Sequence, residues 1–63
     1  MCLLKIVTER NDILFQNVEE MRFDDDKIIA FDMLRRKREF IGKIHSIDAE
    51  KSVVTVGLKE TAE

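Results

Sequence analysis

Short runs of alternating apolar residues, separated by clusters of turn-forming residues, limit the folds that this sequence can adopt. In "KIIAFDML" (27–34), Ile29, Phe31 and Met33 share one parity, and Ile28 and Ala30 share the other. A period of two is typical of β-strands, and polar clusters between such runs are typical of turns. The clusters are "RND" (10–12), "DDD" (24–26), "RRKRE" (35–39) and "AEK" (49–51).

The pattern therefore predicts five or six strands, in a small all-β barrel or a strongly bent meander. A change of phase near residues 17–20 predicts a bulge or a short turn inside the second strand. Helices over 17–21 or 31–37 are the alternative, but neither segment has a cap followed by a sustained helical period. The expected strands are residues 2–9, 13–23, 27–34, 40–48 and 52–59.

Two glycines occur in the whole chain, and both lie inside predicted strands. Gly42 is suited to a bend or bulge in the strand "EFIGKIHSI", because glycine in a strand often marks such a position. Close packing against a bulky neighbour is the other explanation. Gly57 is open to the same two readings.

The chain has 63 residues, enough for one domain, so we expect residues 1–63 to form a single small barrel. Few residues remain to line a water-excluding pocket, which argues against an enzyme. A core this small gives a narrow stability margin, which favours a homodimer. The 11 basic and 13 acidic residues give a net charge of −2, so no overall positive field predicts a nucleic-acid partner.

Cys2 is the only cysteine, so the chain cannot form an internal disulfide, and we expect a cytoplasmic protein. The first apolar run, Leu3–Leu4, is interrupted by Lys5 and is far too short for a signal peptide or a membrane span. The sequence therefore predicts neither export nor insertion into a membrane.

The start of the chain places metal donors side by side. The Met1 amine, if Met1 is retained, the Cys2 amide nitrogen and the Cys2 thiolate form two fused chelate rings in one plane, and the Leu3 amide is a further candidate donor. Planar nitrogen and sulfur ligation suits Ni(II) or Cu(II), whereas structural zinc needs four tetrahedral ligands. If Met1 is removed, the Cys2 amine and thiolate form one chelate ring, and two copies complete a plane of two nitrogens and two sulfurs. In either case one chain is short of ligands, so the site is expected where two chains meet. The alternative is a buried Cys2 that only fills the core.

Three other features could bind a ligand. His45 is the only histidine and a candidate distant metal ligand. The basic run Arg35, Arg36, Lys37 and Arg38 could form a loop that binds RNA phosphates, or a solvated turn paired with acidic residues such as Asp24–Asp26. These three aspartates could also hold Mg(II) or Ca(II), although no calcium-loop spacing follows them.

Over nearly its whole length the chain resembles the CooT family, small nickel-binding proteins first associated with maturation of nickel-containing carbon monoxide dehydrogenase. The resemblance rests on the opening "MC", the first strand "LLKIV", the acidic "NVEEM", and "IGKIHSID" followed by "SVVTVGL". It implies an SH3-like barrel of five to seven short, mostly antiparallel strands. It also implies a homodimer that binds Ni(II) through Cys2 and serves the maturation of a nickel enzyme as a carrier, chaperone or sensor.

Overall fold

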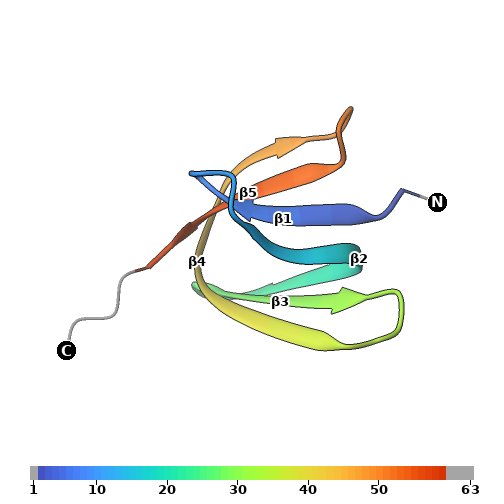
Figure 1. The fold of residues 1–63 in the computed structure, drawn as a ribbon. Helices are drawn as coiled ribbons and strands as arrows, with labels where there is room; N and C mark the ends of the chain where they lie inside the picture. Colours follow the sequence, from blue (N-terminus) through green and yellow to red (C-terminus); the bar gives the residue numbers. More distant parts are fainter. Residues whose placement is uncertain (1, 60–63) are drawn as a thin grey trace.

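The computed structural model describes residues 2–59, which form a closed five-stranded β-barrel (Figure 1). Consecutive strands pair antiparallel, and β1 pairs with β5 in parallel to close the ring. The predicted small barrel of mostly antiparallel strands is therefore confirmed, and the helices considered over 17–21 and 31–37 are wrong. The strands are β1 (Leu4–Thr8), β2 (Ile13–Asp24), β3 (Lys27–Asp32), β4 (Lys37–Asp48) and β5 (Val53–Leu58).

Within residues 2–59, no helix is long and apolar enough to cross a membrane.

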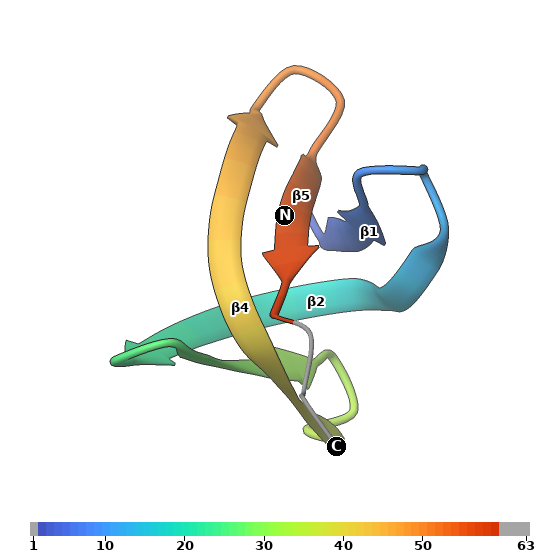
Figure 2. The ribbon, with the colours of Figure 1, turned by 90° about the vertical axis from the view of Figure 1, so that its left-hand side faces the viewer.

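Two 12-residue strands, β2 and β4, hold the barrel together because each pairs with two neighbours. Strand β2 pairs with β1 along its first half and with β3 along its second half. Strand β4 pairs with β3 through residues 37–41 and with β5 through residues 42–48. Figure 2 shows β4 curving across the molecule from the β3 side to the β5 side. Each long strand must therefore bend where it changes partner.

The bend in β2 lies at Asn17, whose φ is 58°. Asparagine adopts this left-handed conformation more readily than most residues. The ladder with β3 slips between Val18 and Glu20, immediately after the bend. The bulge that the sequence predicted near residues 17–20 is confirmed.

The bend in β4 lies at Gly42, where β4 comes very close to β5. A Cβ atom on Gly42 would collide with the Gly57 carbonyl oxygen and lie 2.9 Å from the Leu58 Cα. The Gly42 N–H also donates a 2.7 Å hydrogen bond to the Asp26 carbonyl, which ties the bend to the β2–β3 turn. Gly42 therefore marks both a bend and a close contact, and the close neighbour is backbone rather than a bulky side chain.

The connection between β3 and β4 differs from the prediction. Strand β3 ends at Asp32, two residues earlier than expected, and β4 already begins at Lys37. The turn is thus residues 33–36, because the Asp32 side chain binds the backbone N–H groups of Leu34 and Arg36 and stops the strand. Lys37 and Arg38, expected in a basic loop, instead lie in a strand.

The interior of the barrel is filled by small and branched apolar side chains. The buried cluster is Ile6, Val18, Ile28, Ala30, Phe40, Val54 and Val56, and each strand contributes to it. Asp32 is the one buried charged residue in the described part of the chain. It follows Ile28 and Ala30 on the inward face of β3, so a carboxylate lies where the alternation predicts an apolar side chain.

Replacing Gly42 with alanine should lower the free energy of unfolding by about 1–3 kcal/mol, the usual cost of overpacking. The reason is the collision with the β5 backbone, which cannot move without breaking the β4–β5 ladder. Gly57→Ala is the matched control, because its Cβ would approach no closer than 3.8 Å, to a Glu9 carboxylate oxygen. Urea unfolding of both variants measures the difference. Equal stability of the two variants would contradict the steric explanation.

Candidate functional site

The candidate site lies at the end of the barrel where β1 and β5 begin, on the right in Figure 1. The strand register brings three segments to this end. Leu4 is opposite Val18, which is opposite Asp32, so the start of β1 lies near the β3–β4 turn. Lys5 and Asp48 are both opposite Val53, so the β4–β5 turn lies there too. We call this region the N-terminal end.

Cys2 lies at the N-terminal end, two residues before β1, and its side chain is exposed. The start of β1 is fixed, since the Lys5 N–H donates a 2.9 Å hydrogen bond to the Ser52 carbonyl. Leu3, between Cys2 and β1, is half-buried. The thiol thus stands at the surface just before an anchored strand and does not fill the core. Met1, the other predicted donor, lies outside the described residues.

No second set of metal donors accompanies Cys2 within residues 2–59. No three His, Cys, Asp or Glu side chains come together there as a metal-binding group. The His45 Nδ1 instead lies 3.2 Å from the Glu9 carboxylate. Because Glu9 follows β1, the five residues of β1, about 16 Å of extended chain, separate this pair from Cys2. His45 is therefore not placed to join Cys2 within one chain.

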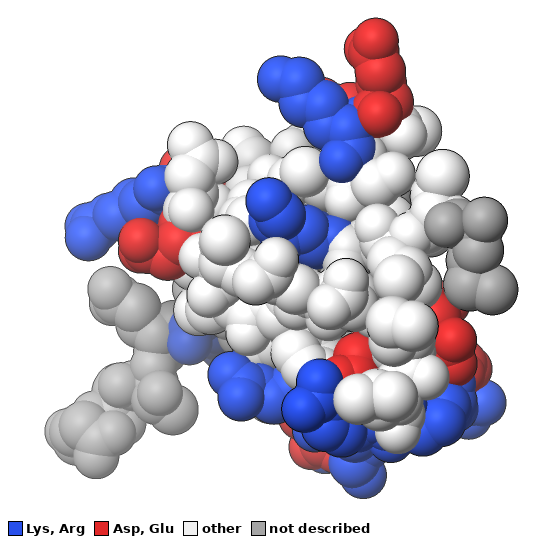
Figure 3. Space-filling model, turned by 45° about the vertical axis from the view of Figure 1, so that its right-hand side comes forward, with Lys and Arg blue, Asp and Glu red and all other residues white. Residues whose placement is uncertain are grey.

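Large apolar side chains are exposed toward both ends of the barrel: Met33 and Leu34 at the N-terminal end, and Phe23, Ile41 and Leu58 toward the β2–β3 turn. Leu34 and Ile47 are among the most exposed large hydrophobic residues, at 68% and 65%, and Met33 is 54% exposed. Met33 and Leu34 belong to the β3–β4 turn, whereas Ile47 pairs with Val54 and so lies level with Ile6, in the middle of β1. Figure 3, which turns this end toward the viewer, shows a largely uncharged area with one basic side chain near its middle and the other charged groups at its margins. Such a surface is typical of protein contacts.

The β3–β4 turn is held in place by the buried carboxylate of Asp32. Its Oδ1 accepts hydrogen bonds from the N–H groups of Leu34 (2.9 Å) and Arg36 (2.8 Å). Its Oδ2 accepts a 2.7 Å hydrogen bond from the Arg36 Nε. A further hydrogen bond of 2.9 Å, from the Met33 N–H to the Asn17 carbonyl, ties the turn to the bend in β2. These bonds fix the backbone that presents Met33 and Leu34 to solvent.

The ionisation of Asp32 follows from these contacts. Burial alone would raise the pKa of the Asp32 carboxyl, but the hydrogen bonds from Arg36 and Leu34 and the Arg36 charge lower this pKa below its usual value. The folded protein therefore favours the carboxylate over the acid. Sequence reasoning missed this residue, although an aspartate at a core position of an alternating strand was a visible signal.

The basic run is bound to acidic neighbours other than the aspartates suggested from the sequence. Arg35 contacts Glu19 at 2.8 Å and Glu20 at 3.1 Å, and these hydrogen bonds raise the pKa of Arg35. Arg35 also lies over the Phe31 ring, 4.6 Å from its centroid.

The other three basic residues of the run also have contacts within the barrel. Arg36 pairs with Asp32, and Lys37 lies 3.5 Å from Glu39. Arg38 lies over the Phe15 ring, 5.6 Å from its centroid. Each of the four therefore already has a partner within the chain.

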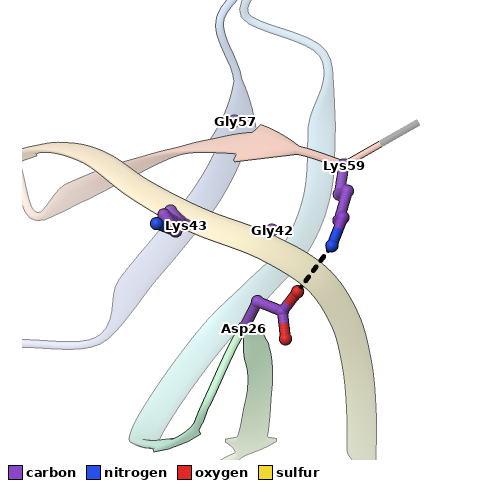
Figure 4. Close-up of a pocket in the computed structure, with 5 residues that line it drawn as sticks. All are labelled: Asp26, Gly42, Lys43, Gly57 and Lys59. Carbon is purple, nitrogen blue, oxygen red and sulfur yellow. Dashed lines mark hydrogen bonds and ion pairs between the residues drawn. The ribbon is translucent and has the colours of Figure 1, made fainter. Parts of the chain in front are cut away.

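The predicted aspartate cluster lies at the opposite end of the barrel, in and beside the β2–β3 turn. Asp26 binds the Lys59 Nζ at 3.0 Å, and this hydrogen bond lowers the pKa of the Asp26 carboxyl. The two residues, with Gly42, Lys43 and Gly57, line a shallow surface hollow (Figure 4). The hollow contains no thiol, hydroxyl or imidazole group. Asp26 pairs with a lysine, and among the described residues no three His, Cys, Asp or Glu side chains come together here.

Comparison with known proteins adds no relative: no protein-family model matches this chain, and no curated protein matches it. The resemblance to the CooT family therefore remains a prediction from the sequence.

Asp32 should make folding sensitive to acid. Because the folded state lowers the pKa of Asp32, its carboxylate stabilises the fold above the unfolded pKa, and this contribution is lost as the pH falls through the folded pKa. Asp32→Asn should be less stable at neutral pH, and its stability should change less between neutral pH and pH ~3. Urea unfolding at both pH values measures this, with the exposed Asp24→Asn as control. An unchanged acid dependence in Asp32→Asn would contradict the assignment.

Proposed function

We propose that this chain is a non-catalytic Ni(II)-binding protein that holds the metal through its N-terminal Met-Cys segment at a homodimer interface. The observation that carries the proposal is the exposed Cys2 thiol, two residues before the fixed start of β1. An exposed thiol on an anchored strand is accessible to a metal ion and keeps a defined position. Nickel is the cargo of the protein in this proposal.

The donor set favours nickel on chemical grounds. One chain offers the Cys2 thiolate together with backbone nitrogen from Cys2, the Met1 amine or Leu3, and these donors suit a planar ion. The described residues hold no further group of metal-binding side chains. The missing ligands of a four-coordinate plane are then supplied by the Cys2 segment of a second copy.

A single thiolate per chain favours a carrier, chaperone or sensor over a storage protein. The proposed partner is a protein of nickel-enzyme maturation that supplies or receives the ion, in the cytoplasm. The resemblance to the CooT family supports this assignment.

Titration of the purified protein with Ni(II) should produce thiolate-to-metal charge-transfer absorption. The absorption should saturate at about half an equivalent of Ni(II) per chain, because two chains share one planar ion. Cys2→Ser should abolish this band. His45→Gln is the matched control and should titrate like the wild type, because His45 contacts Glu9 beyond the far end of β1. Nickel binding by Cys2→Ser equal to that of the wild type would refute the proposal.

Nickel affinity should also fall as the pH is lowered, because the thiolate and nitrogen ligands must lose protons to bind the metal. The same titration repeated across a pH series tests this. An affinity independent of pH would contradict the Cys2 site, because its thiol and nitrogen ligands must release protons when they bind the metal.

Binding of RNA through Arg35, Arg36, Lys37 and Arg38 is the alternative function. Arg35, Arg36 and Lys37 pair with carboxylates within the barrel, which reduces the positive charge available to phosphates, so we expect RNA affinity to be weak. Binding measured against salt concentration tests the alternative. Tight, salt-dependent binding that is lost when the four residues are replaced would favour RNA over nickel.

A further inference from the structure

The second half of β4 has a free edge. Residues 42–48 pair with β5 on one side, whereas on the other side β3 reaches only residues 37–41. Among residues 2–59, no backbone hydrogen bond reaches residues 43–48 from the side away from β5. In Figure 2 the upper half of β4 has β5 along one side and no strand along the other. An unpaired strand edge is a template on which another chain can add a strand.

The backbone groups on this edge are directed outward. The Gly42 N–H points away from β5, since it donates its hydrogen bond to the Asp26 carbonyl in the β2–β3 turn. Successive residues of a strand point their backbone groups to alternate sides. The N–H and C=O of Ile44 therefore also point away from β5, and no described residue pairs with them.

Ile47 shows independently that a neighbouring strand is missing. It lies opposite Val54 in the ladder with β5, so both side chains are on the core face of the sheet. Val54 is 2% exposed, but Ile47 is 65% exposed. Ile44 follows the same rule more weakly, being half-buried opposite the fully buried Val56. A strand added to the edge of β4 would cover both isoleucines.

We propose that residues 43–48 of β4 bind an extended segment of another protein, which adds to the sheet as an antiparallel strand. This inference goes beyond the proposed function and does not depend on nickel. Strand β5 lies between β4 and β1, so the edge is separate from the Cys2 segment. The edge is about 20 Å long, which suits a short peptide.

Unpaired charges at the two ends of the edge indicate the chemistry of the segment. Lys43 and Asp48 are exposed, and neither forms an ion pair within residues 2–59. An antiparallel strand places its first residue opposite Asp48 and its last residue opposite Lys43. The segment therefore carries a base at its amino end, an acid at its carboxyl end and apolar residues opposite Ile44 and Ile47.

The bulge in β4 sets the length of the segment. Because the ladder slips between Ile44 and Ser46, the six residues 43–48 pair with only five residues of β5, from Val53 to Gly57. A strand on the opposite edge meets the same bulge and also needs five residues. Its second and fourth residues then lie on the core face, beside Ile47 and Ile44.

A second copy of the chain is the other candidate occupant, because antiparallel pairing of two β4 edges would also place Lys43 opposite Asp48. The bulge argues against it, since bulges hinder the pairing of two folded edges. Two copies would have to match two bulged strands, whereas a flexible segment has to adapt to only one. The observations therefore favour an extended segment of a different chain.

The free half of β2 is a less suitable edge. Its core-face residue Phe23 is 59% exposed, like Ile47. However, the charged residues beside it are already paired: Glu20 with Arg22 and Arg35, and Glu19 with Arg35. Charges that are already paired within the barrel offer less to an added strand.

The peptide Lys-Val-Thr-Val-Glu, blocked at both ends, is the probe for this edge. Titrated into the isotope-labelled protein without Ni(II), it should cause saturable NMR shifts concentrated at residues 42–48 and slow the hydrogen exchange of the Ile44 amide. The control peptide Lys-Val-Thr-Pro-Glu lacks the N–H that would pair with Ile44 and should not bind. Absence of saturable shifts at residues 42–48, or equal binding of both peptides, would overturn the proposal.

Variants of the protein locate the site. Ile47→Asp should raise the dissociation constant of the peptide by roughly tenfold or more, because it replaces the central apolar contact. Lys43→Glu should weaken binding less, and its effect should diminish at high salt. Phe23→Asp is the matched control on the free half of β2 and should bind like the wild type. Circular dichroism and thermal unfolding establish that each variant is folded.

Two other outcomes would also reject the assignment. Binding weakened by Phe23→Asp but not by Ile47→Asp would place the peptide on β2. Association of the wild type alone that Ile47→Asp abolishes, measured by sedimentation velocity without Ni(II), would show that a second copy occupies the edge. Neither result bears on nickel binding, which the Cys2→Ser titration tests separately.

Discussion

The structure of the N-terminal end of this barrel depends on the hydrogen bonds accepted by the buried carboxylate of Asp32. It stands on the inward face of β3, where every earlier inward residue is apolar, and it is stable there because three hydrogen bonds replace its lost hydration. Those bonds end β3, shape the turn and let β4 begin at Lys37. One buried polar group thus determines which residues leave the sheet and become exposed. Its cost in desolvation is offset by a turn with a single defined conformation.

The second requirement is closure of the ring, which needs two long strands to bend. Asn17 provides the bend in β2 through a left-handed backbone, and Gly42 provides the bend in β4 by letting it approach the β5 backbone. Closure places β1 between β2 and β5, so β1 has no free edge. The segment that carries Cys2 is therefore attached to a strand held on both sides. A thiol on a free terminal arm would lack this fixed position.

Local features of the fold could be predicted from the sequence, whereas pairings between distant residues could not. Three predicted features depend only on residues that are neighbours in the sequence: the alternation in residues 27–34, the turn at the three aspartates and the change of phase near Asn17. The corresponding strand, turn and bulge are all present. The parallel pairing of β1 with β5 joins the two ends of the chain, and no local pattern encodes it. The partners of the basic run were misjudged for the same reason, since Arg35 meets Glu19 across 16 positions of sequence. The same holds for the candidate site. Cys2 could be identified from its place in the sequence, but the exposure of Leu34 and Ile47 could not, because it depends on the Asp32 turn and on the end of β4.

Sharing one metal between two chains would link nickel binding to association. If the plane is completed only by a second Cys2 segment, then each nickel ion bound favours the dimer, and each dimer formed raises the affinity for nickel. The apparent affinity then depends on protein concentration as well as on metal concentration. A protein that competed for the proposed dimer interface would weaken the metal site without touching its ligands, because it would separate the two halves of the donor set. Under the proposed function, the contacts that hold the two protomers together would therefore also set how firmly the ion is held.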